Sequence, residues 1–270
     1  MKKRNNIIVN TVLGILGFIW VTPVFFVFLS IFKTKQEYNT ENFWSFPSQN
    51  NLIENIKALF DSTPILSSML SSLLYAFLGA LFSVIIATLA AYGLSHLKIK
   101  HKMFWFLFIY SGTIFPFQIY LIPIYKAYTK LGLYDTRIGM ILFYTAICIP
   151  FGMFVMRNFF TGISREICES AKVDGAKDMD ILIRLFVPMA KAPIAVCFLA
   201  QFTWAWNDLM FGLTFTKSSD IKPIMSVLSI MDKGNGPTLF LACILVSIPT
   251  LLLYAFLQKD FETGFVYTSK

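Results

Sequence analysis

Charged residues are scarce in this chain. Lys, Arg, Asp and Glu make up 14% of its 270 residues, whereas a typical soluble domain carries about 25%. Hydrophobic residues make up 56% and include 29 Phe and 11 Met, which is more apolar bulk than one water-soluble core of this size could bury. The shortage of charge therefore argues against a soluble enzyme and for a chain whose solvent is the lipid bilayer.

Several chemical signatures are also absent from the sequence. The four cysteines are scattered and form no C-x-x-C pair, so we expect packing residues. With two His and no H-E-x-x-H, a membrane-embedded enzyme has no evident catalytic or metal-binding set. No G-x-x-x-x-G-K-[ST] is present to hold ATP phosphates. We therefore predict no catalytic residue, no metal and no cofactor on this chain.

Apolar segments long enough to cross a bilayer recur along the chain. A spanning helix needs about 20 residues, and six segments qualify: residues 7–32, 68–95, 103–125, 138–157, 192–215 and 238–257. No small-residue cleavage site follows the first, so we expect a retained helix rather than a signal peptide. The sequence predicts an all-α membrane protein with about six transmembrane helices.

The basic residues indicate how these spans are oriented. With the N-terminus inside, the inside segments carry 14 Lys and Arg and the outside segments carry 9. The sharpest cluster is Lys98, Lys100 and Lys102, which falls on the inside. We therefore expect both termini in the cytoplasm. The basic residues that give the net charge of +8 lie mostly in short loops between apolar segments, so we expect contact with membrane lipid and no nucleic-acid partner.

Small residues and prolines recur within the predicted spans. Gly79, Ala80, Ala87 and Ala91 follow the second span at spacings that permit close helix packing. Five prolines fall inside spans, where each removes a backbone donor and favours a kink: Pro23, Pro116, Pro123, Pro150 and Pro249.

A polar segment, residues 158–191, separates the fourth and fifth predicted spans. Ser164 is placed to cap a short helix whose periodicity puts Ile167, Ala171 and Val173 towards one face. Gly175 is placed to end that helix. A second helix is expected from about residue 177 until Pro188 breaks it. This pattern predicts either a rigid elbow for a partner or an amphipathic helix resting on lipid headgroups.

The spacing within this segment favours the elbow. Glu169, Ala171 and Gly175 are followed after nine residues by Leu185-Phe186-Val187-Pro188. This Glu-x-Ala-x3-Gly pattern resembles the cytoplasmic loop by which permease subunits of ABC importers engage their ATPase.

The resemblance extends over most of residues 68–264. The chain looks like the permease subunits of carbohydrate-uptake ABC importers of the maltose-transporter type. The matching segments, in chain order, are Pro116-Phe117-Gln118, Leu121-Ile122-Pro123-Ile124-Tyr125, Leu131-Gly132-Leu133, Asp135-Thr136, Arg157-Asn158-Phe159-Phe160 and Trp206-Asn207-Asp208.

This resemblance implies partners and roles. The chain would pair with a second homologous permease, two copies of an ATP-binding subunit and an external solute-binding protein that delivers a carbohydrate. The coupling positions would be Glu169, Ser170, Ala171, Asp174, Gly175 and Pro188, with Glu169 facing the ATPase groove and Asp174 helping to hold the elbow. Ser170 stands where the family usually has Ala, and the tail lacks the small-residue run that many relatives carry.

Asp208, in the fifth predicted span, is the only acidic side chain inside any predicted span. A charge at membrane depth costs roughly 2.5–3.5 kcal/mol on insertion scales, so it usually faces protein or a wet cavity. Together with Trp204, Asn207 and Gln118 it could line a translocation path, since aromatic faces and amides suit a sugar. It could equally serve helix packing or a helix break.

Other functions remain open at this point. An ABC permease for a polyol phosphate, an amino acid or a peptide would share the coupling motif. An ion-coupled secondary transporter would need more intramembrane charges and inverted repeats. We divide the chain into an N-terminal helix with an outer loop (1–66), a transmembrane domain (67–264) and a cytoplasmic tail (265–270).

Overall fold

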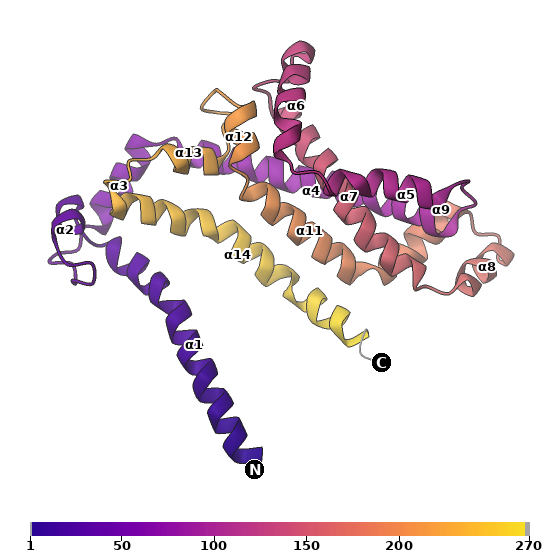
Figure 1. The fold of residues 1–270 in the computed structure, drawn as a ribbon, viewed down its shortest axis with the longest axis horizontal. Coiled ribbons are helices and arrows are strands. Elements are labelled where there is room, and N and C mark those ends of the chain that lie inside the picture. The colour runs from indigo at the N-terminus through magenta and orange to yellow at the C-terminus, as the bar shows by residue number, and fades with distance from the viewer. Residues whose placement is uncertain (1, 268–270) are drawn as a thin grey trace. The chain divides into compact units, whose positions relative to one another are not determined.

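The computed structural model describes residues 2–267, and the side chains of residues 9–258. The tail predicted at 265–270 lies outside the residues whose side chains are described. Within the described range the chain is helical and contains no strand. Figure 1 shows the elements, which are α1 (Lys2–Ser30), α2 (Lys35–Thr40), α3 (Leu52–Ser62), α4 (Ile65–His96), α5 (Lys102–Tyr110), η1 (Ser111–Thr113), α6 (Gln118–Leu131), α7 (Arg137–Thr161), α8 (Arg165–Val173), α9 (Asp178–Ile181), η2 (Leu182–Phe186), α10 (Val187–Met189), α11 (Lys191–Trp206), α12 (Met210–Phe215), α13 (Ile224–Ile230) and α14 (Gly236–Tyr267).

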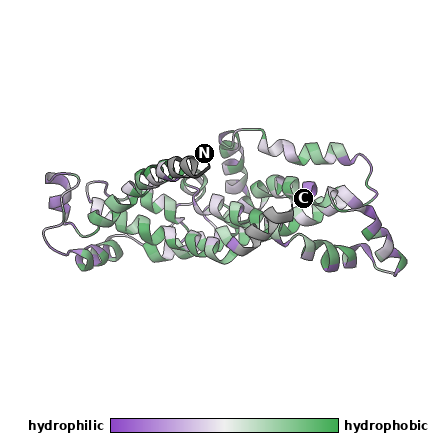
Figure 2. Ribbon diagram, turned by 90° about the horizontal axis from the view of Figure 1, so that it is seen from below, coloured by the Kyte–Doolittle hydropathy of each residue, from purple (hydrophilic) through white to green (hydrophobic). Residues whose placement is uncertain are grey.

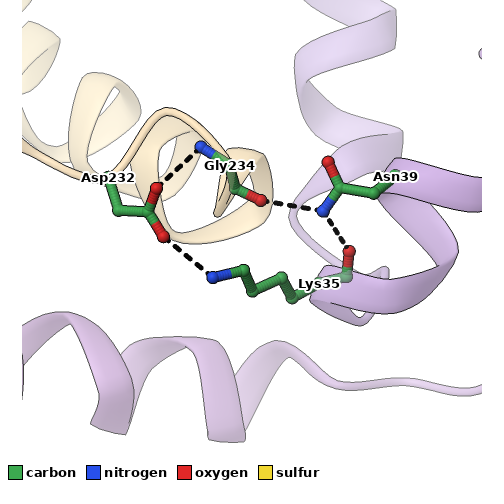
Figure 3. Close-up of polar contacts among 4 residues, drawn as sticks. All are labelled: Lys35, Asn39, Asp232 and Gly234. Atoms are coloured by element: carbon green, nitrogen blue, oxygen red, sulfur yellow. Dashed lines mark hydrogen bonds and ion pairs between the residues drawn. The ribbon is translucent and has the colours of Figure 1, made fainter.

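The helices fall into two compact units. One combines the residues up to 66 with 227–247, and the other combines 67–226 with the residues from 248 on. In the first unit, Lys35 Nζ contacts Asp232 Oδ2 at 2.8 Å and Asn39 Nδ2 donates to the Gly234 carbonyl at 2.8 Å (Figure 3). These bonds join α2 to the turn before α14, although the two segments are far apart in sequence.

The second unit is built on close packing of α7 against α11 and against α4. A Cβ added at Gly79 of α4 would lie 2.8 Å from Tyr144 Cβ of α7. A Cβ added at Gly152 would lie 2.6 Å from Gln201 Nε2 and 3.0 Å from Ala87 Cβ. Ala80, Ala87 and Ala91 are buried, as the small-residue pattern predicts.

The predicted number of about six membrane spans is reached only if two bent helix pairs each count as one span. Four helices are long and apolar enough to cross a bilayer, and two bent pairs raise the number to six if each pair is one span. Figure 2 shows these long helices as largely hydrophobic. The third predicted span is not continuous, because Lys102–Thr113 and Gln118–Leu131 meet at 94°. Pro116 lies in the break, where it offers no backbone donor and restricts the residue before it.

The fifth predicted span is also broken, so the prediction of one helix over 192–215 is wrong. Helix α11 ends at Trp206, and α12 begins at Met210. Asn207 Nδ2 donates to the Thr203 carbonyl at 2.8 Å, and Asp208 accepts from backbone N–H groups ahead of it. Short polar side chains that bond the backbone in this way compete with the continuing helix.

Candidate functional site

The segment between α7 and α11 begins with the predicted helix α8. Ser164 is its N-cap, and Ser164 Oγ accepts from the Glu166 N–H at 3.2 Å. The Glu166 carboxylate also lies in the first turn, where the helix dipole favours a negative charge. The predicted start of this helix is confirmed.

A tight turn at Gly175 ends α8, also as predicted. Gly175 has φ +84°, in the left-handed region that favours glycine. The Ala176 N–H donates to the Ala171 carbonyl at 2.9 Å, and the Gly175 N–H donates to the Lys172 carbonyl at 3.0 Å. These two bonds satisfy carbonyls at the helix end. No atom lies within 4 Å of a Cβ added here, so the backbone conformation, not space, requires glycine.

An ion pair spans this turn. Lys172 Nζ lies 2.8 Å from Asp178 Oδ1. The hydrogen bond with Asp178, and then its charge, raise the pKa of Lys172. The Asp174 side chain makes no hydrogen bond with the described residues, and only its backbone N–H takes part, donating to the Ser170 carbonyl. The polar contact across the turn therefore comes from Lys172 rather than Asp174.

The second half of the segment contains a π-helical turn that the sequence analysis did not predict. Residues 182–186 form η2, and the Val187 N–H donates to the Leu182 carbonyl. Pro188 lies inside α10 and does not end it, which corrects the expectation of a break at this residue. Proline is tolerated because it stands in the first turn of α10. The chain bends by 78° only after Met189.

The buried side of the segment is anchored in the helix bundle. Cys168 of α8, together with Ile181 and Phe186, packs in one cluster with Tyr92 of α4 and Phe160 of α7. The Phe186 ring centroid lies 5.2 Å from those of both Tyr92 and Phe160. We call residues 164–189 the elbow, since two short helices meet at a fixed turn and share the core of α4 and α7 (Figure 1).

The outer side of the elbow is exposed. Ile167 and Ala171 are partly buried whereas Val173 is 87% exposed, so the prediction that puts all three towards one face is wrong for Val173. Cys168 is the buried residue of α8 instead. Glu169, Ser170 and Asp174 are exposed on α8 and its end. The apolar side chains of Met179 and Ile183 are also more than half exposed. The elbow therefore presents a mixed charged and apolar surface.

The basic segment after α4 lies at the same end of the bundle as the elbow. The His96 ring meets the Phe186 ring of the elbow edge to face, with ring centroids 4.6 Å apart. Lys102 Nζ donates to the Ser95 carbonyl at 3.3 Å, which folds the start of α5 back onto the end of α4. The segments richest in positive charge, 96–102 and 157–191, therefore lie at one end of the helix bundle.

A cavity of about 630 Å³ lies beside the other end of α11. This volume falls within the range of small-molecule sites. All four residues predicted for a translocation path line it, although they come from three segments: Gln118 from α6, Trp204 from α11, and Asn207 and Asp208 from the break. The remaining lining residues are Phe117, Ala200, Thr203, Leu209, Met210 and Phe211.

Asp208 holds the break together. Its Oδ2 accepts from Tyr144 Oη at 2.9 Å and from the Gly212 N–H at 3.0 Å, and its Oδ1 accepts from the Phe211 N–H at 3.4 Å. The carboxylate thus satisfies two donors at the start of α12 and the hydroxyl of α7. This geometry favours the helix-break role for Asp208.

One contributor to the site escaped the sequence analysis. Tyr144 carries no motif and reaches Asp208 only because α7 and α11 pack together. No signal in the sequence could have identified it. Gln201, a polar residue near Asp208 in the same predicted span, is buried in α11 and donates to the Cys148 carbonyl at 3.2 Å.

Comparison with known proteins agrees with this arrangement. The chain is 27% identical over 259 residues to an osmoprotective compounds uptake permease protein of Synechocystis, covering 92% of this chain and 87% of that protein. It is 27% identical to a lactose transport system permease protein of Rhizobium radiobacter, covering 81% of each. It also shares its fold with a chain of a bacterial ABC transporter that imports the acidic polysaccharide alginate, with a TM-score of 0.83 and 21% identity over 95% of this chain and 96% of that one.

One family match spans nearly the whole sequence. Residues 2–266 match the family described as "Binding-protein-dependent transport system inner membrane component". That description fits the apolar spans, the elbow at their basic end and the cavity beside α11. The chain belongs to the family of inner membrane components of binding-protein-dependent transport systems.

Proposed function

We propose that the chain is a permease subunit of an ATP-driven importer of carbohydrates. It would work with a second homologous permease, two copies of an ATP-binding subunit and an external solute-binding protein. The family description supports the binding protein, and a relative named for lactose transport supports the substrate class. In this role the chain itself performs no covalent chemistry.

The elbow is the observation on which the proposal rests most heavily. Its inner side is fixed to α4 and α7 by buried aromatic side chains, and its outer side exposes Glu169, Asp174 and Val173. A partner that binds this outer side would press on a rigid part rather than on a flexible loop. A headgroup-binding helix would instead be expected to carry mainly basic residues on its exposed face, whereas the exposed residues of the elbow are of both signs, with Glu169 and Asp174 beside Arg165 and Lys172.

The basic residues around the elbow also indicate the orientation of the chain in the membrane. The Lys and Arg residues around the elbow favour the cytoplasmic side, where an ATP-binding subunit would be found. Both termini would then be cytoplasmic. ATP would be bound by that separate subunit, and this chain would need no cofactor. The division into residues 1–66, 67–264 and 265–270 stays a prediction.

Helix α11 would connect the elbow to the cavity. It begins two residues after the elbow and ends at Trp206 beside the cavity. Its 16 residues span about 24 Å at 1.5 Å per residue. A movement of the elbow would therefore be carried along one helix to the side chains that line the proposed path, Trp204, Asn207, Asp208 and, across the cavity, Gln118.

Crosslinking tests the elbow's role. The reporter would be Val173→Cys, because Val173 is far more exposed than Ala171. The background would be Cys243→Ser, since Cys148, Cys168 and Cys197 are buried and Cys243 is exposed. In membranes that contain the co-expressed ATP-binding subunit, we expect a crosslink to that subunit.

The matched control is Leu131→Cys, which is 70% exposed at the end of α6 and predicted to lie outside. It should not crosslink to the ATP-binding subunit and should react with a membrane-impermeant thiol reagent added from outside. If Val173→Cys instead reacts from outside and forms no crosslink, both the orientation and the coupling role are wrong. The crosslinking result does not depend on which solute is transported. Uptake assays decide whether that solute is a carbohydrate, a phosphorylated polyol, an amino acid or a peptide.

A further inference from the structure

The cavity beside α11 carries no cationic side chain among the described residues that line it. Its polar side-chain groups are the amides of Gln118 and Asn207, the hydroxyl of Thr203, the indole N–H of Trp204 and the carboxylate of Asp208. A solute that bears a carboxylate or phosphate would lose hydration on entering the cavity and would find no group of opposite charge there. Such an unpaired charge is costly to bury.

Asp208 would make this cost larger. Its carboxylate accepts from Tyr144 Oη and from the N–H groups of Phe211 and Gly212. Three donors directed at one carboxylate are the surroundings of an ionised, acceptor-only group. A second negative charge in the same cavity would be repelled, because one wall is already negative.

An uncharged saccharide finds suitable groups instead. The Trp204 ring is half-buried and is held by the rings of Phe117 and Phe211, whose centroids lie 5.6 and 6.3 Å away. Trp204 lines the cavity, and the accessible part of its ring can cover the apolar face of a sugar ring. The Gln118 amide is exposed and makes no hydrogen bond within the described residues. Asn207 uses its Nδ2 on the Thr203 carbonyl, which leaves Oδ1 free to accept from a hydroxyl.

We propose that this cavity is a saccharide subsite of this subunit and that it selects uncharged saccharides over uronates and sugar phosphates. The inference rests on the proposed carbohydrate transport and deepens it by naming the class of substrate. The selection would act within the membrane subunit, in addition to any choice made by an external binding protein.

Protection from thiol labelling tests the subsite. Asn207→Cys in the Cys243→Ser background would be labelled in the purified permease complex without ATP. The probes would be a panel of neutral disaccharides, the corresponding uronate disaccharides and glucose 6-phosphate. At a neutral saccharide concentration equal to its dissociation constant, labelling should slow about twofold, and it should be unchanged by the anions. Val173→Cys on the elbow should be labelled at the same rate in all cases.

A charge substitution tests the selection itself. Gln118→Lys places a cation in the cavity at an exposed position without an intramolecular hydrogen bond. It should allow a uronate disaccharide to protect Asn207→Cys, whereas the neutral control Gln118→Met should not. Absence of protection by every neutral disaccharide, or equal protection by uronates in the Gln118 protein, overturns the proposal. The same holds if Gln118→Lys leaves the selectivity unchanged.

The outcome is separable from that of the proposed function. The labelling assay needs neither ATP nor the ATP-binding subunit, and its reporter lies at the opposite end of α11 from the elbow. A crosslink from Val173→Cys with no saccharide protection would retain the importer and remove the subsite. Saccharide protection without that crosslink would retain the subsite and remove the coupling role.

Discussion

The elbow and the break at Asn207–Leu209 are two interruptions at opposite ends of α11, and they are held by different forces. The elbow is fixed by apolar burial, with Cys168, Ile181 and Phe186 in a core shared with α4 and α7. The break is fixed by hydrogen bonds that converge on Asp208. Apolar burial suits a part that must resist force from outside. A polar anchor suits a cavity wall, where the same groups can meet a hydrophilic solute.

The largest expected effect comes from Gly175→Val. A β-branched residue at φ +84° costs about 1–3 kcal/mol of strain, and no neighbouring atom prevents the turn from opening to relieve it. We expect uptake to be abolished while membrane insertion is retained. Uptake by whole cells and the amount of protein in the membrane fraction are the two measurements.

The matched controls separate strain from position. Gly175→Asn should keep substantial uptake, because Asn tolerates the left-handed region. Gly132→Val creates the same kind of strain at φ +68°, away from the elbow, and should leave ATPase coupling intact. Normal uptake by Gly175→Val would remove the turn from the coupling account.

Asp208→Ala should have the next largest effect, confined to the cavity end. It removes the acceptor for Tyr144 Oη and for two N–H groups of α12. Loss of a cap costs about 0.5–2 kcal/mol, and the orphaned Tyr144 hydroxyl adds to this. We expect lower thermal stability of the purified complex and slower uptake, with the Val173→Cys crosslink unchanged. Unaltered uptake and sugar selectivity would exclude Asp208 from the site.

Tyr144→Phe should have a smaller effect of the same kind. It deletes one of the three hydrogen bonds to Asp208, which is worth about 1.5–3 kcal/mol when the acceptor is charged, and it leaves the α12 donors satisfied. Stability should fall less than in Asp208→Ala, and the double variant should cost less than the sum of the two single ones. Strict additivity in this double-mutant cycle would show that the two side chains act independently.

Lys172→Ala should have the smallest effect. Its ion pair with Asp178 is half-exposed, and such pairs contribute little. The raised pKa of Lys172 means that its contribution is fully present below the unfolded-state pKa and is lost only as pH rises through the higher folded-state pKa. At neutral pH, the protein with Lys172→Ala should therefore take up solute as fast as the unsubstituted protein. A large loss of uptake would show that the ion pair, rather than the buried core, holds the elbow.

Local rules sufficed to predict the elbow from sequence, but not all of its packing. Ser164 and Gly175 were predictable because a cap and a left-handed turn each depend on one residue type. Val173 was placed wrongly, because at 3.6 residues per turn it lies about 200° around the helix from Ala171 and so faces the other way.

The cavity was predictable in its residues but not in its construction. Gln118, Trp204, Asn207 and Asp208 stand out as polar or aromatic groups within apolar spans. Their meeting depends on two helix breaks that apolar run length cannot reveal, because 103–125 and 192–215 remain hydrophobic across them. The role of Tyr144 could not be predicted from the sequence, since only tertiary contact between α7 and α11 brings it to Asp208.

The central claim is that α11 transmits movement between the two regions, and cavity labelling under ATP tests it most directly. The labelling rate of Asn207→Cys would be measured in the complete importer with and without ATP, in proteins that carry Gly175 or Gly175→Val. The account predicts that ATP changes the rate when Gly175 is present and leaves it unchanged in Gly175→Val. A rate that does not respond to ATP with Gly175 present, or that responds equally in both, would contradict it.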